Sequence, residues 1–262
     1  MALGASAARE GAAGESLPIW GLPGQPRLRL RVGCATGAAP GKPNEDYYGV
    51  SHAVDAPERG IVLAIADGIS PHAGARPMSE MVVRSLLHDF YAVPEHWSTS
   101  RALDRLLEAT NQWLASENRR RHALAGVVVA LSVLVLRENR YYLAHVGDTR
   151  VYRRRASVLR QLTTDHTWPR RDLRHVLKRA VGLDSHLVAD FAEGELRAGD
   201  TFLMASDGVW DVLGDAAQCS VLEGCAEPGP AARRLVENAL KHQAGYMGRN
   251  DATALVAAVE DA

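Results

Sequence analysis

Short apolar runs bounded by glycine and acidic residues dominate the hydrophobic pattern of this chain. Four of them end at an aspartate or begin from one: 61–66, 141–146, 201–205 and 252–256. Runs of this length with such boundaries are typical of buried strands. Together with shorter alternating runs, they predict strands at about 28–32, 46–53, 60–66, 127–136, 141–146, 151–153, 158–162, 187–192, 201–206 and 252–259.

Apolar residues at three- and four-residue steps predict three helices, at 78–90, 103–114 and 231–240. A short helix is also expected in the polar segment 165–182. Most predicted strands are joined by hairpin-length connections, which favour antiparallel sheets over a doubly wound parallel fold. We therefore predict an α+β fold in four α-β-β-α layers, with two central antiparallel sheets flanked by helices.

Composition narrows the classes of partner. The chain has 262 residues and a net charge of −1, so bulk charge draws it to neither nucleic acid nor membrane. No apolar run approaches the length of a membrane span. Three cysteines form no disulfide framework in a chain of this length, and we expect a cytoplasmic protein with reduced thiols. Residues 1–26, rich in Ala and Gly, are expected to be a disordered leader before a domain at 27–262.

The acidic residues at the strand ends are the best clue to chemistry. They are Glu45, Asp46, Asp67, Asp148, Asp207 and Asp251. If these ends coincide, several negative charges converge, and a cation is needed to neutralise them. Oxygen ligands without a Cys/His set favour Mg²⁺ or Mn²⁺ over zinc. Gly68, after Asp67, would let a backbone carbonyl approach the same site.

The ordered set of motifs resembles the metal-dependent protein phosphatase 2C family, over roughly residues 28–260. The segments that carry the resemblance are Asn44-Glu45-Asp46, Ala66-Asp67-Gly68, His145 to Tyr152, Leu162 to His166, Ser206 to Asp211, and the region of Asp251-Ala252-Thr253. Residues 90–98 look like a bacterial subgroup in which a kinase domain often follows the phosphatase domain. No kinase motif is present in this chain.

The resemblance implies two Mn²⁺ or Mg²⁺ ions, and a third in bacterial members. Asp67 would bridge both ions, and Gly68 would give its carbonyl to one of them. Glu45 and Asp46 would bind one ion or its waters, Asp207 would bind the other, and Asp148 would hold the third. The implied reaction is hydrolysis of phosphoserine and phosphothreonine in proteins by direct attack of a metal-bridging hydroxide, with Asp46 and Asp67 in the catalytic set. A cognate kinase is an expected partner.

Two departures from the family pattern leave alternatives open. Where bacterial members carry a phosphate-binding arginine, this chain has Gly41 followed by Lys42, and Lys42 is the candidate substitute. The last motif usually reads Asp-Asn-x-Thr, but here it reads Asn250-Asp251-Ala252-Thr253. Either the Asn250 amide or the Asp251 carboxylate is then the ligand, and we favour Asp251 because it carries charge. These departures motivate an alternative function, a catalytically weak family member that binds and regulates a phosphoprotein.

Overall fold

The structure, a computed structural model, describes residues 15–17, 20–22, 25–70, 75–121, 124–170, 172–173, 175–244 and 250–261. Its strands are β1 (Glu15–Ser16), β2 (Trp20–Leu22), β3 (Gln25–Gly37), β4 (Asp46–His52), β5 (Ile61–Ile69), β6 (Val128–Arg137), β7 (Arg140–Val146), β8 (Arg150–Arg155), β9 (Val158–Gln161), β10 (Asp190–Glu195), β11 (Thr201–Ala205) and β12 (Ala252–Asp261). Its helices are α1 (Ala75–Asp89), α2 (Thr99–Arg120), α3 (Asp207–Gly224) and α4 (Pro228–Gln243), with a short 3-10 turn, η1, at Pro57–Arg59.

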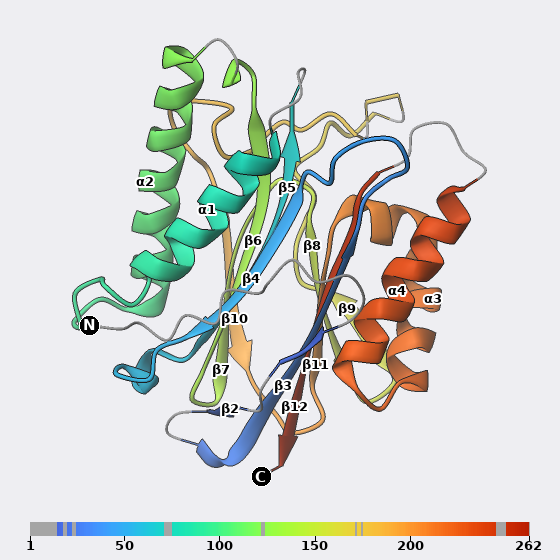
Figure 1. Cartoon of the computed structure of the whole chain (residues 1–262). Helices are drawn as coiled ribbons and strands as arrows, with labels where there is room; N and C mark the ends of the chain where they lie inside the picture. Colours follow the sequence, from blue (N-terminus) through green and yellow to red (C-terminus); the bar gives the residue numbers. More distant parts are fainter. Residues whose placement is uncertain are drawn as a thin grey trace.

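Two antiparallel sheets lie face to face between two pairs of helices, as predicted (Figure 1). One sheet has the strand order β10-β7-β6-β5-β4 and is covered by α1 and α2. The other has the order β1-β3-β12-β11-β8-β9, with β2 beside β3, and is covered by α3 and α4. The four-layer α+β sandwich is therefore confirmed.

Strand β5 shows how the apolar runs create these layers. Its side chains alternate between two cores: Val62, Ala64 and Ala66 pack toward the α1/α2 layer, whereas Ile61, Leu63 and Ile65 pack between the sheets. Because successive strand residues point to opposite faces, a strand covered on both sides has no polar face, which explains its uninterrupted apolar sequence.

Two predictions from the sequence need correction, and one helix was not predicted. Residues 165–182 contain turns and an isolated bridge between Thr167 and Leu177, and the described part of that segment forms no helix. Helix α3 was not predicted, and it is interrupted by Gly214 at φ 66° and ψ 163°. Within the expected leader, β1 and β2 pair with β3 and Trp20 is buried, so Glu15–Ser16 and Trp20–Leu22 are strands of the sheet. Residues 1–14 lie outside the described part of the chain, and the domain boundary stays a prediction.

No helix in the described residues is long and apolar enough to cross a membrane. The three cysteines are free thiols. At one end of the sandwich the β3–β4 connection crosses from one sheet to the other, close to the start of β12 (Figure 1). The predicted acidic residues lie around this end.

Candidate metal centre

Asp46 and Asp67 face each other across two neighbouring strands. They are partners in the register of β4 and β5, and Asp46 is buried. Gly68 is required beside them, because a Cβ there would lie 2.3 Å from Ser79 Oγ on α1. The close approach of α1 thus depends on Gly68, whose carbonyl is expected to face the same site.

Asp207 joins this pair through the serine that precedes it. Ser206 caps α3, its Oγ donates to Asp46 Oδ2 at 2.7 Å, and the same Oγ accepts the Thr253 N–H at 2.9 Å. One hydroxyl therefore ties β4, α3 and β12 together. Asp207 occupies the first turn of α3, where the helix dipole favours a negative charge.

Asp148 approaches from the turn between β7 and β8. Gly147 has φ +105°, and a Cβ there would lie 2.4 Å from the Ala130 Cβ, so only glycine fits. The Asp148 carbonyl accepts a hydrogen bond of 2.9 Å from Trp210 Nε1, which fixes the turn against α3. Asp148 itself is buried.

The four carboxylates Asp46, Asp67, Asp148 and Asp207 strongly resist ionisation together. Burial raises the pKa of Asp46 to about 8, and the charges of Asp251 and Asp207 add to this shift. Burial, with the charge of Asp207, also raises the pKa of Asp148 to about 8. The pKa of Asp67 lies well above its usual value because of burial and its acidic neighbours, and the pKa of Asp207 rises to about 6. In its ionised form such a cluster is costly unless a cation neutralises it.

Two of these carboxylates also carry orphaned atoms. Among the described residues, Asp46 Oδ1 and Asp148 Oδ1 are buried without a hydrogen-bond partner. Buried oxygens in this state are costly unless an ion or water satisfies them. No group of three or more His, Cys, Asp or Glu side chains in the described ranges is arranged to hold one ion. That arrangement still fits Mg²⁺ or Mn²⁺, because Mg²⁺ usually retains several waters and needs only one or two protein carboxylates.

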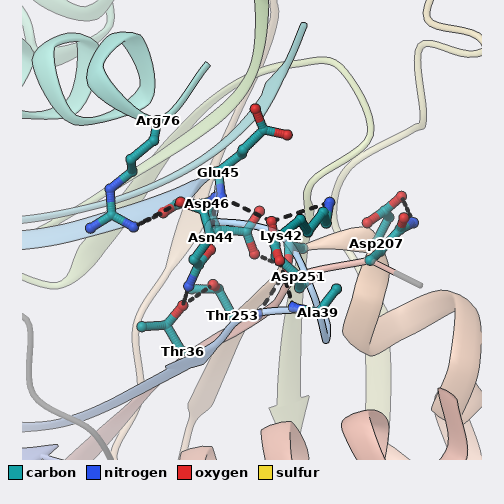
Figure 2. A network of polar contacts seen from close by, with 12 residues as sticks. Thr36, Ala39, Lys42, Asn44, Glu45, Asp46, Arg76, Asp207, Asp251 and Thr253 are labelled. Carbon is teal, nitrogen blue, oxygen red and sulfur yellow. Dashed lines mark hydrogen bonds and ion pairs between the residues drawn. The ribbon is translucent and has the colours of Figure 1, made fainter. Parts of the chain in front are cut away.

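Both carboxylate oxygens of Asp251 are engaged with the backbone of the loop at 39–45 (Figure 2). Its Oδ1 accepts the Ala39 N–H at 2.7 Å and its Oδ2 accepts the Glu45 N–H at 2.8 Å. Lys42 Nζ lies 3.4 Å from the same Oδ2. Although partial burial opposes it, the Asp251 charge raises the pKa of Lys42. Asp251 thus closes the loop at 39–45 and keeps Lys42 charged at its rim.

Asn250, the neighbour of Asp251, points the other way. Its Nδ2 donates to Asp207 Oδ2 at 2.7 Å, and its backbone N–H is held by Gln243 Oε1 at 2.7 Å. The Glu45 side chain extends away from Asp251 in Figure 2, so the backbone N–H of Glu45 and its carboxylate face different surroundings. The structure therefore gathers Asp46, Asp67, Asp148, Asp207 and Asn250, with Lys42 and Glu45 at the edge.

Sequence reasoning missed several residues that hold these groups. Arg76, near the start of α1, donates from Nη1 to the carbonyls of Asn44 and Asp46, both at 3.1 Å, as Figure 2 shows. Thr36 receives a bond from Asn44 Nδ2 at 2.8 Å and contacts the Thr253 hydroxyl at 2.7 Å. No local pattern marks Arg76, because its partners are backbone carbonyls more than 29 residues away in sequence.

Comparison with known proteins identifies the family. The chain belongs to the protein phosphatase 2C family, whose sequence model matches residues 36–242. It is 29% identical over 218 residues to the serine/threonine protein phosphatase PstP of Mycobacterium tuberculosis, a match that covers 76% of this chain. The same match covers only 40% of that relative, so the chain spans less than half of its length.

A second relative and a solved structure agree with this assignment. The serine/threonine phosphatase stp of Listeria innocua is 27% identical over 199 residues, covering 69% of this chain and 77% of the relative. The catalytic domain of PstP, solved in complex with two manganese ions, superimposes with a TM-score of 0.73 at 29% identity. That superposition covers 89% of this chain and all of the solved domain.

Proposed function

We propose that this protein is a metal-dependent phosphatase that removes phosphate from phosphoserine and phosphothreonine in proteins. The observation that carries the proposal is the convergence of four carboxylates from β4, β5, the β7–β8 turn and α3, in which the charges of Asp46, Asp148 and Asp207 all act on Asp67. Two of the four have orphaned buried oxygens. The family assignment and the relatives named as serine/threonine phosphatases support the same reaction.

Asp67 with the Gly68 carbonyl, Asp46 and Asp207 are the residues that would hold two divalent cations, Mn²⁺ or Mg²⁺, and Asp148 would hold a third. Such cations supply an activated water and neutralise charge on a phosphoryl group. Glu45, at the rim, would contact waters of the same site. Ser206 contributes by orienting Asp46, since its Oγ donates to Asp46 Oδ2.

For the last ligand we infer Asn250 and not Asp251. Both oxygens of Asp251 accept backbone N–H groups, whereas the Asn250 amide lies against Asp207. When Asn250 donates from Nδ2 to Asp207, its Oδ1 is the atom left to face a cation. An amide oxygen brings no charge, so this site should bind its cation more weakly than a site with an additional carboxylate.

Lys42 is the residue we assign to the phosphate. Its ammonium lies at the rim of the site and is held by Asp251, which supports a charged state near neutral pH. Lysine contacts a phosphate oxygen as a point charge and without the bidentate geometry of arginine. A phosphoprotein substrate and a cognate kinase partner remain proposals from the family, and a cytoplasmic location stays a prediction.

The test is hydrolysis of p-nitrophenyl phosphate and of a phosphothreonine peptide by the full chain, with Mn²⁺ or with EDTA. We expect turnover of both substrates with Mn²⁺ and none with EDTA, and Asp67→Asn as the matched inactive variant. Turnover independent of metal would refute the metal-dependent mechanism. Absence of turnover at every Mn²⁺ concentration, with phosphopeptide binding retained, would instead support the alternative of a catalytically weak regulatory module.

A further inference from the structure

The turn that carries Asp148 is hydrogen-bonded to His166, a residue with no role in the proposed chemistry. The His166 backbone N–H donates to the Gly147 carbonyl at 2.7 Å. In return, the Gly147 N–H donates to His166 Nδ1 at 3.2 Å. Main chain and side chain of one residue therefore hold both polar groups of the glycine that precedes Asp148.

This contact defines where the proton of His166 lies. Because a backbone N–H can only donate, Nδ1 accepts and the proton of the neutral ring is on Nε2. Nε2 faces Asp190 Oδ2 at 3.1 Å, and His166 is 2% exposed. Arg179 Nη1 also lies 3.4 Å from Nε2, but a guanidinium cannot accept a hydrogen bond. Asp190 is therefore the acceptor of the hydrogen bond from the Nε2–H. Asp190 thereby holds the ring in the tautomer whose Nδ1 can accept the hydrogen bond from the Gly147 N–H.

The other side of Asp148 is held by a second polar chain. Ser132 Oγ contacts Thr149 Oγ1 at 2.8 Å and His145 Nδ1 at 2.9 Å. The His145 ring packs against that of His166 in a tilted arrangement, with centroids 4.9 Å apart and an interplanar angle of 37°. Gly147 is thus held by His166, and Thr149 is held by Ser132, which also contacts His145. Asp148 lies between these two held residues.

We propose that His166, with its tautomer held by Asp190, is a positioning residue for the Asp148 carboxylate. This inference rests on the proposed function, because it concerns a carboxylate assigned to a cation. Gly147 has a positive φ and no side chain, so its backbone is soft and the peptide that carries Asp148 needs an external hold. The unpartnered Asp148 Oδ1 is the atom whose direction this hold sets.

Two substitutions separate this role from simple packing. In His166→Asn, the amide oxygen lies near the position of Nδ1 and can still accept from Gly147. In His166→Gln, the longer amide reaches toward Nε2 and Asp190, and no acceptor remains for Gly147. Both variants lose the ring and its contact with the His145 ring, so both should lose similar thermal stability in EDTA.

The readout is Mn²⁺ binding, measured by calorimetry and by electron paramagnetic resonance, in the wild type and both variants. Loss of outer partners of metal ligands typically weakens metal binding 10- to 100-fold. We expect His166→Gln to weaken the Asp148-dependent Mn²⁺ binding about 10-fold, and His166→Asn to stay within about 3-fold of wild type. Asp148→Asn identifies which binding step depends on Asp148, and adding His166→Gln to it should cause no further loss.

Equal Mn²⁺ affinity in all three proteins would overturn the proposal. So would an equal loss in both variants, because the ring would then act by packing alone. These binding outcomes do not require turnover. If the wild type binds Mn²⁺ but hydrolyses no phosphoester, the proposed function fails while the role of His166 is still decided.

Discussion

Asn250 donates from Nδ2 to Asp207 Oδ2 at 2.7 Å, so an amide and not a carboxylate stands beside the first residue of α3. We predict that Asn250→Asp lowers the Mn²⁺ concentration needed for half-maximal activity roughly tenfold, because it adds a charged oxygen ligand. The same change should lower the thermal stability of the metal-free protein, because it adds another negative charge next to Asp207.

Asp251→Asn is the matched control for this prediction. Both oxygens of Asp251 accept a backbone N–H group, and an asparagine has only one oxygen. The substitution therefore leaves one of the two backbone N–H groups, of Ala39 or of Glu45, without an acceptor. We expect a loss of about 1–2 kcal/mol of stability, with Mn²⁺ affinity changed less than in Asn250→Asp. A large loss of Mn²⁺ affinity in Asp251→Asn, with no gain in Asn250→Asp, would show that Asp251 is the ligand after all.

Asp207→Asn should abolish Mn²⁺-dependent activity and yet stabilise the metal-free fold. The folded-state pKa of Asp207 is about 6, above its usual value of 3.8, so the folded protein pays an ionisation penalty that is complete at pH 8. Removing that charge should raise the unfolding free energy in EDTA by roughly 1–2 kcal/mol at pH 8, and by less at pH 5. Thermal unfolding with and without EDTA measures this, alongside turnover. A destabilised apo variant would argue against the charge cluster.

Lys42→Met should raise KM for p-nitrophenyl phosphate about five- to tenfold with little change in kcat, if its ammonium binds the phosphate. Gly41→Arg in that background should recover part of the affinity, because nothing lies within 4 Å of a Cβ at this position. The φ of +87° at Gly41 makes any side chain there cost roughly 1 kcal/mol of stability. Steady-state kinetics decide the matter, and an unchanged KM in Lys42→Met would place the phosphate elsewhere.

His145 should make the protein less stable as the pH falls. Burial, with the neighbouring His166 charge, lowers the pKa of His145 from 6.5 to about 4. Because the histidine pKa is lower in the folded protein, the unfolded chain takes up the proton first as the pH falls. The contribution of His145 to the free energy of unfolding is therefore fully present above pH 6.5 and is lost as the pH falls toward 4. Through His145 the protein should lose roughly 2 kcal/mol of unfolding free energy when the pH falls from 7 to 5.

Two measurements check this behaviour. The NMR signals of the His145 ring should stay those of the neutral form down to about pH 5. Thermal unfolding should also depend less on pH, between pH 7 and pH 5, in His145→Gln than in the wild type. A ring that titrates near pH 6.5 in the folded protein would contradict the prediction.

The strands were predictable because a strand buried on both faces has an uninterrupted run of apolar residues in its sequence. Runs such as 61–66 and 202–205 contain no polar residue, and both lie in strands packed between layers. Helix α3 has no comparably clear sequence pattern. It begins with Ser206-Asp207-Gly208, a sequence that also forms turns, and the break at Gly214 interrupts its periodicity. Gly208 is nevertheless necessary, since a Cβ there would lie 2.1 Å from the Asp251 carbonyl.

The sequence alone determined that acidic residues stand at the ends of buried strands, and hence that a cation would be needed if those ends met. Only the tertiary structure decided which of two neighbouring residues, Asn250 or Asp251, turns toward Asp207. Adjacent residues of an extended segment point in opposite directions, and the choice depends on the register of β12 against β3, in which Ala252 is paired with Gly37. The loop at 39–45 then presents its backbone N–H groups to Asp251, an arrangement that no local pattern encodes.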